Sequence, residues 1–209
     1  MDLDATRRLK MAQAVGREAD DLLVGAGLLD IVRVCGPTRV GGSVALGLMV
    51  RREVDVYVQL PEARDTVAFL ALGTALAQRF VVHKASYSNH FVRGLPGFDE
   101  GLFWGIRLEQ GGNRWKLDLW GYGPERYRIA QAEFERLAAD LERVDRGLIL
   151  AIKHAYLDGD GYRDGVTGAA IYAAVLAGVR DAGEFQAWLM KPTGPPRLTV
   201  ACAHSGLEA

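Results

Sequence analysis

The sequence predicts an α+β fold, in which a mixed sheet with flanking helices is followed by a helical C-terminal part. Runs of alternating apolar and polar residues, typical of half-buried strands, lie before residue 125. Runs with the apolar spacing of helices dominate after it. One helical run also separates two of the strands, so the chain is expected to cross back over the sheet there.

This pattern divides the chain into three parts. Residues 1–125 carry the predicted strands, and residues 126–191 form the helical C-terminal part. Residues 192–209 are rich in Pro and Gly and are expected to be a loosely packed extension. The 209 residues are 49% hydrophobic and 24% charged, which suffices for one good core or two small ones.

Charge and cysteine content narrow the class of protein. The chain has 25 basic and 26 acidic residues, so it lacks the excess of positive charge that favours binding to duplex nucleic acid or to an anionic membrane. A local basic patch is compatible with this balance. Cys35 and Cys202 match neither a disulfide framework nor a zinc site, which favours a cytoplasmic location. The N-terminal residues lack the apolar region of a signal peptide, and no apolar run approaches the ~18 residues of a membrane span.

The first elements alternate between helix and strand. Residues 5 to about 29 predict one helix, broken near Gly25. The segment "RVGGSV", residues 39–44, predicts a strand that enters a tight turn. Residues 53–60 alternate strictly and predict a strand with one apolar and one polar face. The apolar face carries Val54, Val56, Val58 and Leu60, and the polar face carries Glu53, Asp55, Tyr57 and Gln59.

A crossover helix and three further strands complete the predicted sheet. Residues 61–80 predict the helix, and residues 81–88 the strand that follows it. Residues 101–110 and 114–122 alternate and are joined around Gly111-Gly112, which predicts a hairpin. A turn centred on these glycines places Gly105 opposite Asp118 and would leave space above its carboxylate. Lys116, Asp118 and Trp120 then share the polar face with Arg107.

The helical part is predicted to contain four helices, over residues 128–142, 144–157, 167–180 and 182–190, with Thr167 as an N-cap. The segment "LDGDGYRDG", residues 157–165, superficially resembles a calcium loop. Counted from Asp160, its twelfth position is Ile171 where calcium requires Glu, so we interpret it as a polar turn between helices.

Two acids on one face of a strand raise the question of what neutralises them. Glu53 and Asp55 project from the same face, and their repulsion is costly unless a cation lies between them. Magnesium suits hard oxygen ligands, and Asp118 is the natural third carboxylate. Three such acids would hold two ions ~4 Å apart, which stabilise both the attacking and the leaving oxygen of a phosphoryl transfer. A solvated polar face is the simpler interpretation of the acid pair taken alone.

The spacing of these motifs resembles a known family. "GGS", then nine residues, then "EVDV" and a distant "KLDLW" are similar to the nucleotidyltransferase superfamily related to DNA polymerase beta. The resemblance covers about residues 30 to 122. It implies that Gly42 and Ser43 hold the triphosphate, that Glu53 and Asp55 bind both metal ions, and that Asp118 completes the site and helps to activate the acceptor hydroxyl.

Two residues depart from the family pattern. Glu53 stands where the family has Asp, and its extra methylene moves the carboxylate by roughly one bond length in a site that tolerates about 0.5 Å. Arg51 and Arg52 replace the small or polar residues that often precede the acids. Arg51 shares the face of Glu53, so it would either neutralise this acid or bind a phosphate oxygen.

The resemblance implies a magnesium-dependent transfer of a nucleoside monophosphate from a nucleoside triphosphate to an acceptor. The near-neutral charge favours a small-molecule or protein acceptor over nucleic acid. Two other functions stay open: an inactive nucleotide-sensing or protein-interaction module, and a sugar-nucleotide glycosyltransferase, which would not account for the Gly-Gly-Ser turn. Trp120 would be hairpin core or stack on a base, and Lys153 and His154 would be surface residues or contact the substrate.

Overall fold

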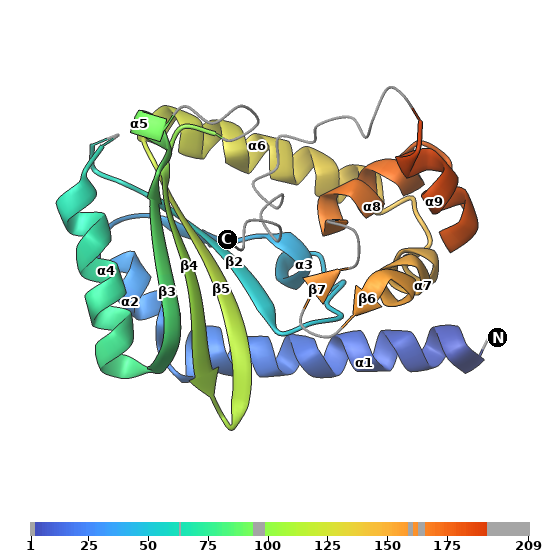
Figure 1. Cartoon of the computed structure of the whole chain (residues 1–209), viewed down its shortest axis with the longest axis horizontal. Helices are drawn as coiled ribbons and strands as arrows, with labels where there is room; N and C mark the ends of the chain where they lie inside the picture. The colour runs from blue at the N-terminus through green and yellow to red at the C-terminus, as the bar shows by residue number, and fades with distance from the viewer. Residues whose placement is uncertain (1–2, 63, 94–98, 159–160, 163–165, 192–209) are drawn as a thin grey trace.

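A computed structural model describes residues 3–62, 64–93, 99–158, 161–162 and 166–191 (Figure 1). The predicted extension at residues 192–209 lies outside these ranges. In the part of the chain that the structure describes, no helix combines the length and the apolar character needed to cross a membrane.

The core of the fold is a mixed five-stranded sheet in the order β1-β2-β5-β4-β3. The central pair β2 and β5 is parallel, and the other pairs are antiparallel. The strands are β1 Thr38–Val40, β2 Glu53–Gln59, β3 Val81–Asn89, β4 Leu102–Gln110 and β5 Asn113–Tyr122. The predicted mixed sheet is therefore confirmed.

The hairpin of β4 and β5 has the predicted register, with Gly105 opposite Asp118. Gly111 and Gly112 have φ angles of 59° and 74°, the left-handed conformation of a two-residue hairpin turn. The expected space beside Gly105 is absent. A β-carbon built on Gly105 would lie 3.0 Å from the hydroxyl of Ser86 and 3.2 Å from the ring of Phe103, which fill this position.

One face of the sheet packs on N-terminal helices to form the first core (Figure 1). The helices are α1 Leu3–Asp20, the π-helical turn η1 Asp21–Gly25, α2 Leu28–Arg33 and α4 Thr66–Arg79. The helix expected at 5–29 is interrupted near Gly25, as predicted, and Gly27 has φ 81° directly before α2. α4 begins later than expected, since Asp65 caps it by accepting a hydrogen bond from the Ala68 amide at 3.0 Å.

The C-terminal helices form a second core. They are α6 Pro124–Leu141, α7 Arg146–Tyr156, α8 Gly168–Leu176 and α9 Ala182–Leu189. Thr167 caps α8, as predicted, by accepting from the Ala170 amide at 3.1 Å. Helix α1 runs past both parts of the molecule (Figure 1) and contributes Ala19 to the first core and Ala12 to the second.

Short elements connect these layers. Helix α3 (Gly42–Ala45) follows β1, and helix α5 (His90–Arg93) follows β3. The expected interhelix turn after α7 instead contains the two-residue strands β6 Leu157–Asp158 and β7 Gly161–Tyr162, so strands are not confined to the first part.

Candidate active site

The register of the sheet arranges the polar side chains in rows, because residues paired across neighbouring strands point to the same face. The first row contains Glu53, Lys116, Arg107 and Lys84. The second row contains Asp55, Asp118, Gly105 and Ser86. The third row contains Tyr57, Trp120, Phe103 and Ser88. The three predicted acids thus lie in adjacent rows of the central parallel pair.

The aromatic row is closed off from solvent. Trp120 is fully buried and packs on Phe103, with 4.7 Å between ring centroids, and on Tyr122 at 5.6 Å. Tyr127 of α6 covers the same cluster. Trp120 therefore belongs to the core, and no face of its ring is available to a substrate base.

The Gly-Gly-Ser turn is built against Asp55. The Gly41 amide donates to the Asp55 carbonyl at 2.9 Å, and Gly42 has φ 56°. A β-carbon built on Gly42 would overlap the Asp55 carboxyl group, 2.7 Å from its Cγ. Only glycine meets both demands, so this residue type is required for the turn and the acid to approach so closely. Ser43 follows on α3.

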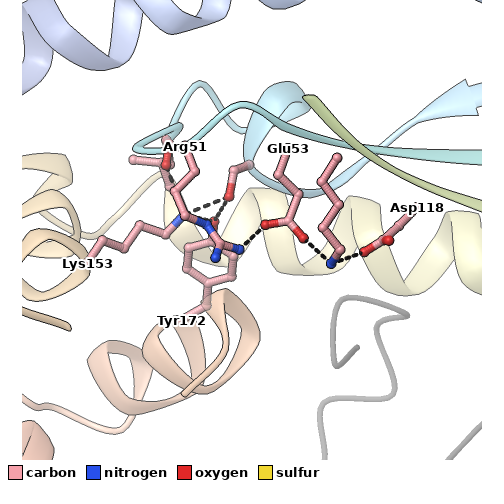
Figure 2. A network of polar contacts seen from close by, with 8 residues as sticks. Arg51, Glu53, Asp118, Lys153 and Tyr172 are labelled. Carbon is pink, nitrogen blue, oxygen red and sulfur yellow. Dashed lines mark hydrogen bonds and ion pairs between the residues drawn. The ribbon is translucent and has the colours of Figure 1, made fainter. Parts of the chain in front are cut away.

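Lys153 of α7 joins this turn to the helical part (Figure 2). The side chain is fully buried, and Nζ donates to Ser43 Oγ at 2.6 Å, the Leu48 carbonyl at 2.8 Å and the Tyr172 hydroxyl at 2.7 Å. The Tyr172 hydroxyl also lies 3.1 Å from Ser43 Oγ. Of the two sequence interpretations, the structure excludes the surface role for Lys153. His154 lies near Arg8 instead, and burial, then the charges of Arg8 and Lys153, lowers its pKa.

Glu53 is held by two cations (Figure 2). Lys116 Nζ lies 2.6 Å from Glu53 Oε1 and 2.7 Å from Asp118 Oδ2, and Arg51 pairs with Glu53 Oε2. Of the two roles expected for Arg51, the pairing with Glu53 is the one observed. The bridging role of Lys116 was not predicted, although its place two residues before Asp118 on one strand was the available signal.

Asp55 and Asp118 face each other across the parallel pair and are buried, with exposed fractions of 8% and 3%. Burial raises the pKa of Asp118 to about 6; the Lys116 ammonium opposes this shift and the Glu53 charge adds to it. Burial, then the charges of Glu53 and Asp118, raises the pKa of Asp55 well above its ordinary value. Burial alone would raise the pKa of Glu53, but the ion pairs with Lys116 and Arg51 outweigh it and lower this pKa.

These shifts show where positive charge is lacking. Glu53 is compensated within the chain, whereas Asp55 and Asp118 repel each other in a dry environment. Asp118 Oδ1 is buried without a hydrogen-bond partner among the described residues. Such oxygens suit a divalent cation, so Asp55 and Asp118 fit a magnesium ion completed by water or phosphate. Glu53 fits less well, and across the described ranges no three His, Cys, Asp or Glu side chains are grouped to hold a metal.

A cavity of about 550 Å³ adjoins Glu53 and Lys116. Six of the described residues that line it are basic, namely Arg51, Arg52, Lys84, Arg107, Arg114 and Lys116. Among the described lining residues, Glu53 is the only acid. His83 and the edge strand β3 form one of its walls. The overall charge balance of the sequence allowed a local basic patch, and the lining of this cavity is such a patch.

The mixed five-stranded sheet with its flanking helices is a nucleotidyltransferase-like fold. The poly(A) polymerase complex GLD-2–GLD-3 shares this fold with a TM-score of 0.58 at 12% identity, over 96% of this chain and 61% of that chain. The Cid1 poly(U) polymerase and a cytoplasmic RNA terminal U-transferase align less extensively, at TM-scores of 0.45 and 0.41 and 15% and 16% identity. They match 70% and 71% of this chain and 46% and 45% of theirs.

The chain spans about three fifths of the length of the GLD-2–GLD-3 chain that it matches. No protein-family model matches its sequence, and neither does any characterised protein sequence. The likeness therefore establishes the fold, and the predicted fold class is confirmed.

Proposed function

We propose that the chain transfers a nucleoside monophosphate from a nucleoside triphosphate to an acceptor hydroxyl and releases pyrophosphate. The observation that carries this proposal is the contact of the Gly42 turn with Asp55, directly opposite Asp118, on a nucleotidyltransferase fold. A turn that brings backbone amides and a serine against paired carboxylates is suited to a triphosphate with its cation.

Each residue has a defined part in this reaction. Gly42 and Ser43 would hold phosphate oxygens, and Lys153 fixes the Ser43 hydroxyl while adding positive charge. Asp55 and Asp118 would hold magnesium, which when bound neutralises the charge of the transferred phosphoryl group. The acceptor oxygen bonds to the α-phosphorus as the bond to the β-phosphate oxygen breaks, and the acceptor proton passes to Asp118. Arg51, which pairs with Glu53, would bind a phosphate oxygen once it leaves this acid.

The cavity beside Glu53 supports an acceptor that carries phosphate or carboxylate groups, because six cations line it. The net charge of -1 still favours a small molecule or a protein over a long nucleic acid. The nucleotidyltransferase fold favours nucleotidyl transfer over glycosyl transfer, which the acid pair alone left open.

The test measures pyrophosphate release from each of the four ribonucleoside triphosphates with magnesium and anionic acceptors. Wild type is compared with Asp55→Asn and with the control Asp30→Asn, a change on the exposed surface of α2. We expect release that Asp55→Asn abolishes and Asp30→Asn leaves intact. Absence of release together with absence of magnesium-dependent triphosphate binding by calorimetry would refute the proposal.

One observation favours a second candidate, an inactive nucleotide-binding module. Lys116 and Arg51 occupy the carboxylate of Glu53, which the family pattern assigns to the metal ions. Triphosphate binding that is lost in Ser43→Ala and Lys153→Met, without turnover with any acceptor, would identify this module.

A further inference from the structure

We propose that Lys116 is a tethered cation that replaces one of the two metal ions, so that the site binds a single divalent ion at Asp55 and Asp118. This inference rests on the proposed function in that it refines the metal content of the same site. It replaces the two-ion arrangement that the resemblance implied.

The position of the Lys116 ammonium is set by the backbone. Lys116 is the partner of Glu53 in the β2–β5 ladder and precedes Asp118 by two residues on the same face. Its Nζ lies 2.6 Å from one carboxylate and 2.7 Å from the other, and the side chain is only 13% exposed. An ammonium between two carboxylates does what a shared metal ion does for the repulsion between them. Because the attachment is covalent, the charge stays in place when no ligand is bound.

The charge of the cluster leaves room for one divalent ion. The carboxylates of Glu53, Asp55 and Asp118 are met by Lys116, by Arg51 and, through its charge, by Lys153. Two of these cations, Lys116 and Arg51, pair with Glu53, so Asp55 and Asp118 are the acids that still lack positive charge. A second divalent ion next to Glu53 would face two cations at close range, which low-dielectric surroundings make strongly unfavourable.

One place for an ion nevertheless remains. Asp118 uses Oδ2 for Lys116, and its Oδ1 is buried without a hydrogen bond among the described residues. Asp55 stands directly opposite on β2. A single ion between these two acids would satisfy the orphaned oxygen while Lys116 keeps its own pair of contacts.

This arrangement explains why residue 53 is Glu where the family pattern has Asp. Its additional methylene lets one carboxylate meet Lys116 on β5 and Arg51 in the preceding loop at the same time. Glu53 and Lys116 thus form one unit, in which the long acid serves the tethered cation instead of a metal ion.

The test counts Mn²⁺ ions bound per chain, by electron paramagnetic resonance of free Mn²⁺ and by calorimetry. The titration is made with Mn²⁺ alone and with Mn²⁺ plus a non-hydrolysable α,β-methylene ATP analogue. We expect one ion for wild type and for Lys116→Arg, two for Lys116→Met with the analogue, and one for the control Lys10→Met on exposed α1. Glu53→Gln should keep one ion, because Glu53 is not a metal ligand in this arrangement.

Two ions bound to wild type, loss of the ion in Glu53→Gln, or no ion at all would each overturn the inference. Circular dichroism checks that Lys116→Met is folded, and should it unfold, the wild-type and Glu53→Gln counts decide alone. One Mn²⁺ without any binding of the ATP analogue would sustain the inference while refuting the proposed function. Two ions bound to the wild type together with pyrophosphate release would refute the inference and support the proposed function.

Discussion

Asp118→Asn should stabilise the metal-free protein increasingly as the pH rises. Asp118 is 3% exposed, and its pKa in the folded protein is about 6, against an ordinary value of 3.8. The folded state therefore binds the proton more tightly than the unfolded state does. For such a group, deprotonation costs folding free energy, and this cost grows as the pH rises from about 4 to 6. Asparagine cannot ionise and does not incur it.

The magnitude follows from the shift of the pKa. A difference of about two pKa units corresponds to about 3 kcal/mol, of which most develops between pH 4 and pH 8. The Asp118 charge also raises the pKa of Asp55, so its removal relieves this second acid in the same direction. The attraction of Lys116 is already contained in this shift, because the Lys116 ammonium lowers the pKa of Asp118 from the higher value that burial alone would give.

The assay is urea unfolding in the presence of EDTA, for wild type and Asp118→Asn at pH intervals from 4 to 8. We expect the difference in unfolding free energy to move in favour of the variant by about 2–3 kcal/mol over this range. Asp30→Asn serves as the control, since Asp30 is exposed and its variant should follow the wild-type curve. Parallel curves for wild type and Asp118→Asn, or a gap that narrows with pH, would refute the assigned electrostatics.

Three further changes probe the turn, the buried lysine and the first acid. Gly42→Ala should lower the unfolding free energy by more than the ~1–2 kcal/mol of left-handed strain, because the new methyl displaces Asp55; Mn²⁺ affinity should fall in parallel. Lys153→Met should cost about 3 kcal/mol in urea unfolding, since it removes three buried hydrogen bonds, and unchanged stability would contradict this. Glu53→Asp should slow pyrophosphate release, because the shorter acid withdraws from its two cations; a faster rate would argue for a decayed site.

The sequence predicted the sheet and the meeting of Asp55 with Asp118 because both depend on backbone pattern. Strict alternation fixes which residues share a face, and the Gly111-Gly112 turn fixes the register of the hairpin that carries Asp118. These rules act over a few residues and need no knowledge of packing. Ser43 was singled out by the resemblance to the nucleotidyltransferase superfamily, in which a Gly-Ser turn precedes the acids, and not by these rules.

The contacts of Lys153 and Tyr172 could not be predicted in this way, because they join elements far apart in the chain. Lys153 lies on the buried face of α7 with Ile149 and Ile152, and this position was the available signal for a buried cation. The sequence alone left open a surface role or a contact with substrate. Tyr172 lies within an apolar helix, and nothing local separates it from ordinary core aromatics.

The pairing of Glu53 with Lys116 has a consequence for the sequence pattern itself. In a parallel pair of strands, "E-V-D" on β2 lies directly opposite "K-L-D" on β5, so each residue of one triplet meets its counterpart. The second positions are apolar and point into the first core, while the third positions are the two aspartates. The first positions then supply one acid and one base of matched length, which meet at 2.6 Å. An aspartate at the first position would be one methylene short of this contact and would leave Lys116 to Asp118 alone. Glu53, which departs from the family pattern, and Lys116, which has no place in that pattern, are therefore the two partners of one ion pair. A substitution of Glu53 alone or of Lys116 alone should disturb the site more than the substitution of both residues together.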